Sequence, residues 1–291
     1  MPLAKRILIC LWLVLLAPAV VFASEKILTI GFFPYTTQTK LLSHQKMLTD
    51  YLQQRMQGKL TVQVAENMPG FVSNMNMNQY DIIFTPPHVA RYSETSLGYQ
   101  RIAMTTHIIK SVYVVHRDSA IKDLTELRGK TIVMASPLAL LTQDTKAKLR
   151  EQGLVDQETV YIKTASSHKN AIFMVLHREA DVAVTGVKLW HRYAESHKKH
   201  LKVLAEGEPL PGMMIMANKD LPVDTVNQLQ RYLLEFENSP QGKKYIFHSF
   251  KRIDNPTMHA LDPYTKVFKY TPLQFESSCK IFTAMQWQCS V

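Results

Sequence analysis

The chain of 291 residues is 46% hydrophobic and 20% charged, with a formal net charge of +10. This is the composition of an ordinary globular protein, and the length permits one large domain or two moderate ones. No stretch after residue 23 approaches eighteen consecutive apolar residues, which argues against a membrane-spanning helix in the body of the chain.

The first 23 residues have the pattern of an export signal. Lys5 and Arg6 precede a ten-residue apolar run over residues 7–16, and residues 21–23 (VFA) match the small-x-small signature of a signal-peptidase site. The apolar run is too short for a comfortable membrane span. We therefore predict a signal peptide over residues 1–23, cleaved after about Ala23, and a soluble protein in the periplasm.

The positive charge narrows the class of partner. It falls to +8 when the leader is removed, because Lys5 and Arg6 leave with it. An exported protein has little opportunity to meet nucleic acid, so the charge favours an anionic solute, a membrane surface or an acidic partner. An ordinary solvated basic surface explains the charge equally well.

Cysteine usage agrees with export. Cys10 leaves with the leader, and Cys279 and Cys289 remain near the C-terminus. Two cysteines in an oxidising compartment most simply form one disulfide, and closing so short a loop stabilises a fold by roughly 3 kcal/mol. Two unpaired thiols or half of a metal site are the alternatives.

After the leader, the chain alternates strands with helices. Strands are predicted over residues 26–33, 60–64 and 80–84, and helices over residues 40–56 and 70–78. This order predicts an α/β fold with a mostly parallel sheet flanked by helices. In such sheets, ligands bind beyond the carboxyl ends of the strands.

A second block of the same kind begins near Ile108. Its predicted strands cover residues 111–116, 131–135, 159–163 and 180–184, and its helices cover residues 123–128 and 144–152, a segment starting at Ser167, and residues 188–200. The chain then returns through strands over residues 201–205 and 212–217 and a helix over residues 224–238. We interpret the second block as a second α/β lobe.

Polar side chains gather in the loops that follow the predicted strands. Loops are polar in general, so their shared position at strand ends is stronger evidence than any one of them. The candidate ligand-binding residues are Tyr35, Thr36, Thr85, His88, Ser136, Thr142, Ser166, Ser167, His168 and Thr185.

The most informative stretch covers residues 164–186. Ser167 is a natural N-cap, and the residues that follow it have the apolar spacing of a helix. A loop that delivers Ser166, Ser167 and His168 to a helix start leaves backbone N–H groups available beside the positive end of the helix dipole. Such a place favours an anion, although Ser167 as a simple cap and His168 as an exposed side chain explain the pattern too.

Four segments in order resemble the phosphate, phosphite and phosphonate substrate-binding proteins of ABC importers. They are residues 80–90 (YDIIFTPPHVA), 118–133 (DSAIKDLTELRGKTIV), 166–184 (from SSHKNA to ADVAV) and 210–222 (from LPGM to NKDLP). The resemblance implies a two-lobe periplasmic binding protein, with residues 24–107 and 206–291 in lobe one and residues 108–205 in lobe two. The ligand would be enclosed between lobes that close by a hinge motion near His107 and Ala205.

The same resemblance places Ser167 and His168 against an anionic head group, with Tyr35, Thr85 and His88 on the facing wall. One loop departs from the family pattern. Phosphonate binders carry a run of hydroxyl residues where this chain has residues 136–142 (SPLALLT). Each lost hydrogen bond to a charged group is worth about 1.5–3 kcal/mol, so we expect an anion other than a plain phosphonate, or a fold that has left the original chemistry.

An enzyme and a soft-metal binder are the other function classes to consider. The sequence has no Gly-x-Ser-x-Gly elbow, no His-Glu-x-x-His and no glycine-rich phosphate loop, so we predict no enzyme and no cofactor. Clustered methionines at residues 75–77 and 213–216 leave a Cu(I) or other soft-metal binder as an alternative, although methionine is a common core residue.

The membrane partner is either an ABC permease or a membrane sensor kinase, because both need a closing pair of lobes and an exposed rim. A monomer that binds a small anionic molecule is the expected form.

Overall fold

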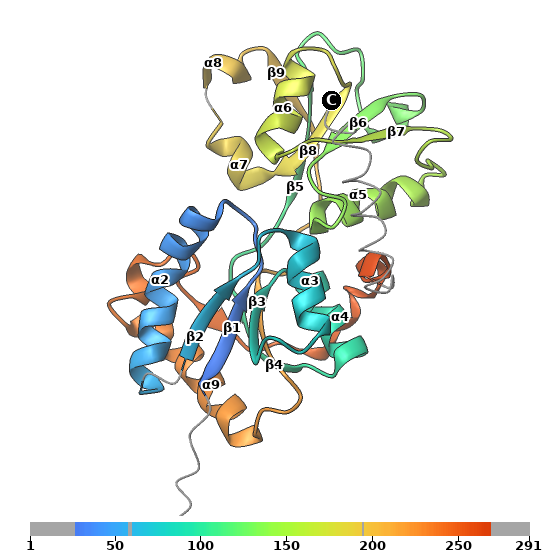
Figure 1. The fold of residues 1–291 in the computed structure, drawn as a ribbon. Helices are drawn as coiled ribbons and strands as arrows, with labels where there is room; N and C mark the ends of the chain where they lie inside the picture. Colours follow the sequence, from blue (N-terminus) through green and yellow to red (C-terminus); the bar gives the residue numbers. More distant parts are fainter. Residues whose placement is uncertain (1–26, 58–59, 194, 269–291) are drawn as a thin grey trace, which may run out of the picture.

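A computed structural model describes residues 27–57, 60–193 and 195–268. The predicted signal peptide, Cys279 and Cys289 lie outside these residues. Two lobes are seen in Figure 1, each built around one sheet with helices on both faces. The α/β two-lobe fold predicted from the sequence is confirmed.

The first lobe contains a six-stranded sheet in the order β11-β4-β10-β3-β1-β2. Its strands are β1 (Leu28–Phe32), β2 (Leu60–Val64), β3 (Ile82–Thr85), β4 (Gln100–Thr105), β10 (Met214–Ala217) and β11 (Phe250–Lys251). β1 pairs in parallel with β2 and β3, whereas β10 runs antiparallel to both β3 and β4. The returning segment of the chain therefore enters the middle of the sheet.

Helices cover both faces of this sheet because each has an apolar stripe. The helices are α2 (Gln38–Arg55), α3 (Met68–Asn76), α4 (Pro87–Leu97) and α9 (Val223–Glu235). Buried side chains of α2 and α9, such as Leu48 and Leu229, share one hydrophobic cluster, and those of α3 and α4, such as Phe71 and Val89, share the other. The sheet is thus the middle layer of three.

The second lobe contains a five-stranded sheet in the order β7-β6-β8-β5-β9. Its strands are β5 (Ser111–His116), β6 (Thr131–Met134), β7 (Tyr161–Thr164), β8 (Val182–Gly186) and β9 (Leu201–Glu206). The helices are α5 (Leu140–Glu151), α6 (His168–Leu176), α7 (Val187–His191) and α8 (Glu195–Lys198), with a 3-10 turn, η1 (Leu124–Leu127). α6 and α7 pack on one face of the sheet, and α5 and η1 pack on the other.

The two lobes repeat one local design. Asp81 precedes β3 and accepts a hydrogen bond from the backbone N–H of Thr29 at 2.8 Å, and Asp181 precedes β8 and accepts one from Thr131 at the same distance. Asn67 caps α3, and Ser167 caps α6, each by accepting an N–H three residues on. In both lobes, therefore, a capped helix starts after one strand and leads into a strand that an aspartate precedes.

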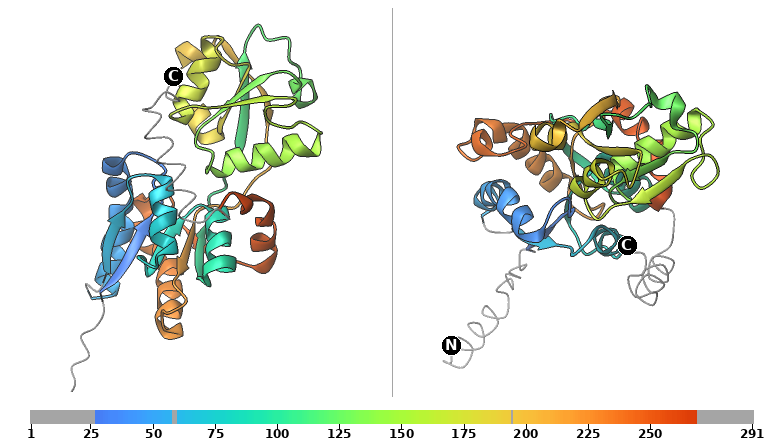
Figure 2. Two further views of the ribbon diagram at one scale, coloured as in Figure 1. Left: turned by 45° about the vertical axis from the view of Figure 1, so that its right-hand side comes forward. Right: turned by 90° about the horizontal axis from the view of Figure 1, so that it is seen from above.

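Strand direction determines where the strand ends lie. β4 leads directly into the crossing at residues 106–110. β3 runs in the same direction as β4, because both are antiparallel to β10, and β1 shares this direction because it is parallel to β3. β5 starts directly after this crossing, and antiparallel β8 ends opposite its first residue, with Gly186 paired to Ser111. The carboxyl ends of β1, β3, β6 and β8 consequently point towards the junction of the two lobes, as Figure 2 shows.

Two segments connect the lobes, and they pair with each other. Ile109 and Leu210 exchange backbone hydrogen bonds of 2.9 and 2.7 Å. Gly212 packs so closely that a Cβ there would lie 2.1 Å from the carbonyl oxygen of His107. Position 212 therefore admits no side chain, which explains a glycine beside the crossing.

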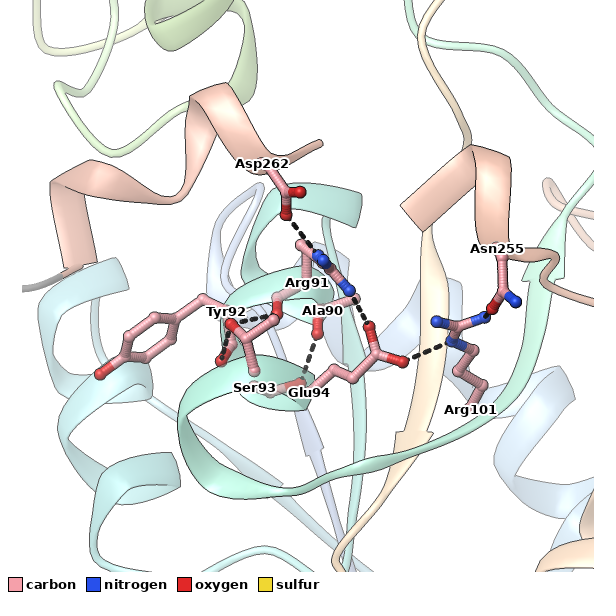
Figure 3. A network of polar contacts seen from close by, with 9 residues as sticks. Ala90, Arg91, Tyr92, Ser93, Glu94, Arg101, Asn255 and Asp262 are labelled. Atoms are coloured by element: carbon pink, nitrogen blue, oxygen red, sulfur yellow. Dashed lines mark hydrogen bonds and ion pairs between the residues drawn. The ribbon is translucent and has the colours of Figure 1, made fainter. Parts of the chain in front are cut away.

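A C-terminal segment packs against the first lobe. It contains α10 (Asn255–His259) and two 3-10 turns, η4 (Asp262–Tyr264) and η5 (Lys266–Phe268). Figure 3 shows Arg91 between Glu94 and Asp262, at 2.7 and 2.6 Å, and Arg101 between Glu94 and Asn255. The Arg91–Asp262 ion pair joins α4 to the C-terminal segment, and the Arg101–Asn255 hydrogen bond joins β4 to it.

Several sequence predictions of element boundaries need correction. The single helix predicted over residues 188–200 is wrong, because the N–H groups of Arg192 and Tyr193 bond three residues back and tighten the end of α7. α5 begins at Leu140, four residues before the predicted start at Asp144. No helix of the described residues is long and apolar enough to cross a membrane.

Candidate ligand-binding site

The candidate residues of the first lobe lie at the carboxyl ends of β1 and β3. The hydroxyl of half-buried Tyr35 accepts a hydrogen bond from Gln45 Nε2 at 2.9 Å, and Tyr245 donates to the other end of the same amide. Burial raises the pKa of Tyr35 to about 12, so its hydroxyl stays protonated at neutral pH. Thr36 is half-buried in the same loop.

Thr85 is the last residue of β3, His88 lies in the first turn of α4, and both are fully buried. His88 Nε2 is 2.9 Å from the carbonyl oxygen of Leu138, which belongs to the second lobe. Burial lowers the pKa of His88 to about 4, against the opposing effect of this hydrogen bond. The imidazole is therefore neutral at pH 7, and it joins the lobes by donating from Nε2.

In the second lobe, the two serines at the start of α6 differ from His168 in exposure and in role. Ser167 Oγ accepts the backbone N–H of Asn170 at 3.1 Å, and Ser166 Oγ accepts from the side chain of the same residue. Both serines are exposed, and both hydroxyls serve the helix start. His168 is half-buried, and burial lowers its pKa despite a hydrogen bond with the backbone of Val184.

Thr185 and Thr142 are both buried near the end of β8. Thr185 lies on β8 next to Val184, and Thr142 lies in the first turn of α5. The α5 helix contacts the end of β8, since Leu141 would lie 3.8 Å from a Cβ at Gly186. The fold therefore brings α5, α6 and β8 together at one edge of the second sheet.

The leucine-containing loop over residues 136–142 joins the lobes. Ser136 Oγ accepts the backbone N–H of Leu138 at 3.2 Å, and the Leu138 side chain is buried in the hydrophobic cluster of the first lobe. Leu140 and Leu141 pack with Leu210 of the second crossing. Leucines at these positions fill the junction between the lobes, which is why the hydroxyl run expected of a phosphonate binder is missing here.

A shared property marks the strand-end residues. Five of them have a buried polar atom with no hydrogen-bond partner among the described residues: Thr85 Oγ1, His88 Nδ1, Thr142 Oγ1, His168 Nδ1 and Thr185 Oγ1. A buried polar atom left unpaired costs about 1–3 kcal/mol. Such atoms gathered at the strand ends of both lobes could bind a polar solute.

Two residues at this edge, Lys188 and Phe247, were not predicted from the sequence. Lys188 follows Thr185 with the spacing by which His88 follows Thr85, a repeat that the sequence displays. The Lys188 charge lies near enough to His107 to help lower the pKa of that histidine, after the larger effect of burial. Phe247, at 5.9 Å from the His107 ring, comes from a segment whose position no local pattern indicates.

Most of the clustered methionines that suggested a soft-metal site lie in the hydrophobic core. Met75, Met214 and Met216 are fully buried in the hydrophobic cluster that also contains α3 and α4, and Met213 is in the other cluster of that lobe. Met77 is exposed. The described residues contain no group of three or more His, Cys, Asp or Glu side chains arranged to hold a metal ion.

Several solved structures have a fold similar to that of this chain. PhnD1 of Prochlorococcus marinus in complex with methylphosphonate has 15% sequence identity and a TM-score of 0.71, and the match covers 84% of this chain and 98% of that one. XAC2383 of Xanthomonas citri bound to ATP has 17% identity and a TM-score of 0.70, with 83% of this chain and 96% of that one covered. A binding protein component of an ABC phosphonate transporter from Pseudomonas aeruginosa has 14% identity and a TM-score of 0.68, with 91% and 97% covered. No curated protein matches the sequence.

Residues 30–255 match the family described as "ABC transporter, phosphonate, periplasmic substrate-binding protein". The match covers both lobes and both crossings, and the family is one of substrate-binding transport proteins. The chain therefore belongs to the phosphonate-type periplasmic substrate-binding proteins of ABC transporters.

Proposed function

We propose that this protein is exported, captures a small anionic solute between its two lobes and delivers it to an ABC permease. One observation carries the proposal: among the described residues, Thr85, His88, Thr142, His168 and Thr185 have buried polar atoms without a partner, and they lie at strand ends or in the first turn of helices near the junction of the lobes. A solute offsets the cost of burying these atoms when its oxygens accept from the threonine hydroxyls and its own O–H or N–H groups donate to the two histidine Nδ1 atoms, which are acceptors because both imidazoles are neutral.

The anionic character of the ligand rests on charge. Lys188 brings a positive charge to the junction, and the start of α6 presents the positive end of a helix dipole beside His168. The structures of similar fold support this choice, because methylphosphonate and ATP are anions. A phosphonate-like oxyanion or a related organic anion is the ligand class.

Lobe boundaries and export complete the proposal. Residues 24–107 and 206–291 form one lobe and residues 108–205 the other, with hinges near His107 and Ala205 that close over the ligand. Residues 1–23 direct the protein to the periplasm and are removed, and Cys279 and Cys289 form a disulfide there. A membrane sensor kinase as partner in place of a permease is the second candidate.

A stability screen tests the binding function. Mature protein is heated with and without phosphate, phosphite, alkylphosphonates, sulfonates and carboxylates, one at a time. A ligand at 100 times its dissociation constant adds about 2.7 kcal/mol to the free energy of unfolding, which raises the melting temperature measurably. If no anion from these classes raises it, the proposed function is wrong.

A substitution tests the site. We expect His168→Ala to weaken binding of the anion found in the screen, because the variant loses the imidazole at the start of α6, whose Nδ1 can accept a hydrogen bond from an O–H or N–H group of the ligand. His177→Ala is the matched control, since His177 is exposed at the other end of the same helix. Titration calorimetry measures both affinities, and equal binding by the His168→Ala variant and the parent would contradict the site assignment.

A further inference from the structure

Four half-exposed rings form a row at the strand ends of the first lobe. Tyr35 stacks with His44 at 6.5 Å between ring centroids, Phe247 lies 6.3 Å from Tyr35, and His107 lies 5.9 Å from Phe247. We call Tyr35, His44, His107 and Phe247 the aromatic row. Each is only partly buried, whereas Phe84 beneath Phe247, at 5.7 Å, is fully buried.

The aromatic row lies at the edge that faces the second lobe. Tyr35 follows β1, His107 follows β4, and Phe247 precedes β11, which pairs antiparallel with the end of β4. All three therefore lie at the junction of the lobes. A bound molecule that covers partly exposed ring surface is stabilised, because it removes that surface from water.

A positive charge stands at one end of the aromatic row. The side chain of Lys188, at the start of α7, is exposed, and the preceding Val187 donates its backbone N–H to the carbonyl oxygen of Lys110, three residues after His107, at 3.0 Å. Burial lowers the pKa of His107, and the nearby charges of Lys188 and His248 lower it further. No carboxylate pairs with Lys188 in the part of the chain that the structure describes. Thr185, three residues before it, has a buried hydroxyl without a partner among the described residues.

The neighbouring loop does not suit a small tetrahedral anion. The side chains of Leu138, Leu140 and Leu141 fill the junction where hydroxyl groups would surround such an anion, and Ser136 Oγ already accepts the N–H of Leu138. The Tyr35 and Phe247 rings meet edge to face at 78°, so the aromatic row offers both ring faces and ring edges. The charge at Lys188, these partly exposed rings beside it and the few hydroxyl donors together specify a different molecule.

Resting on the function proposed above, we propose that the ligand is an aromatic carboxylate or sulfonate, whose charged group pairs with Lys188 and whose ring lies on the aromatic row. The rings of the aromatic row can contact the face or the edge of an aromatic ring in the ligand. The single ammonium group of Lys188 matches a single negative charge on the ligand. The proposal narrows the ligand class from small anions in general to anions that carry an aromatic ring.

Matched pairs of anions test this inference. Binding of benzoate and acetate, benzenesulfonate and methanesulfonate, and phenylphosphonate and methylphosphonate to the mature protein is measured by calorimetry. We expect the aromatic member of the carboxylate and sulfonate pairs to bind at least about tenfold more tightly than its methyl partner. Equal or tighter binding of the methyl members, or no binding by any member, overturns the inference, whereas the proposed function fails only if the stability screen with phosphate, phosphite and the other anions fails as well.

Two substitutions locate the aromatic ring and the charge. Phe247→Leu keeps an apolar side chain but removes the flat ring, and it should weaken benzoate about tenfold while changing acetate by less than about twofold. Lys188→Gln should weaken both members of a pair by similar factors, because both carry the charge. Equal effects of Phe247→Leu on both members, in a variant with unchanged circular dichroism, would show that the aromatic row does not hold the ligand.

Discussion

At the scale of single residues, His88 shows how burial decides chemical behaviour. Its ring is fully buried, 5.2 Å from Phe268 of the C-terminal segment, and its Nε2 bonds to Leu138 of the other lobe. A charged imidazole in this position would lose most of its hydration. The residue therefore acts as a neutral contact between lobes, and its unpaired Nδ1 remains available to a ligand.

This environment predicts an acid-sensitive fold. The pKa of His88 is about 4 in the folded protein, below the value of 6.5 in an unfolded chain, so the unfolded state takes up the proton first as the pH falls. The contribution to stability is complete above about pH 6.5 and is lost as the pH falls to about 4, by about 3 kcal/mol at most.

Urea unfolding at about pH 7 and about pH 4 measures this loss in the parent and in His88→Gln, which keeps a donor for the Leu138 carbonyl but does not titrate. Burial also lowers the pKa of His168, and that effect is common to both proteins. The parent should therefore lose more stability than the variant over this interval. Identical pH dependence in the two proteins would falsify the assignment to His88.

At the scale of elements, helix caps fix the strand-end geometry. Asn67 and Ser167 cap α3 and α6 at equivalent places in the two lobes, so each helix starts at the carboxyl edge of its sheet. The sequence interpretation left open whether Ser167 is a cap or a binding residue. Its hydroxyl accepts the Asn170 N–H, so capping is its structural role, while His168 is the neighbour with an unpaired buried nitrogen.

Replacing the capping residue should cost stability. Ser167→Ala leaves an N–H of the first turn of α6 without its acceptor, and we expect a loss of about 1 kcal/mol. Ser166→Ala is the matched control, because Ser166 accepts only from the Asn170 side chain, and it should lose less than half as much. Equal losses in chemical denaturation would contradict the distinction between the two serines.

At the scale of the whole molecule, the lobes are held together by more than their two crossings. Tyr264 of the C-terminal segment bonds to Asp144 of α5 at 3.2 Å, and Asp262 two residues earlier pairs with Arg91 of the first lobe. Asp144 is almost fully buried and also lies 3.3 Å from Lys148. Together with Leu138, this bridge makes the junction a packed and bonded interface.

Removing the Leu138 side chain tests the importance of this interface. Leu138→Ala leaves a cavity in the first-lobe cluster, so we expect a loss of about 2–4 kcal/mol in unfolding and a larger radius of gyration in X-ray scattering. Leu42→Ala is the control, because Leu42 is 45% exposed and should change neither quantity. A Leu138→Ala variant with the parent's stability and radius would contradict a role for this residue in holding the lobes together.

The sequence by itself determined what depends on neighbours along the chain. Alternating apolar residues defined β2 and β5 at their observed bounds, Ser167 marked the start of α6, and the strand and helix order led to the α/β class. Polar loops at strand ends followed from the same order. All of these features depend on periodicity and capping, which act over a few residues.

Only the tertiary structure decided which distant segments meet. Apolar character showed that Leu138 would be buried, but not that it would enter the core of the other lobe. Neither the entry of β10 between β3 and β4 nor the approach of Lys188 to His107 has a local signal. The physical reason is that burial is non-directional: hydrophobicity removes a side chain from water, while the packing of the whole chain chooses its neighbours.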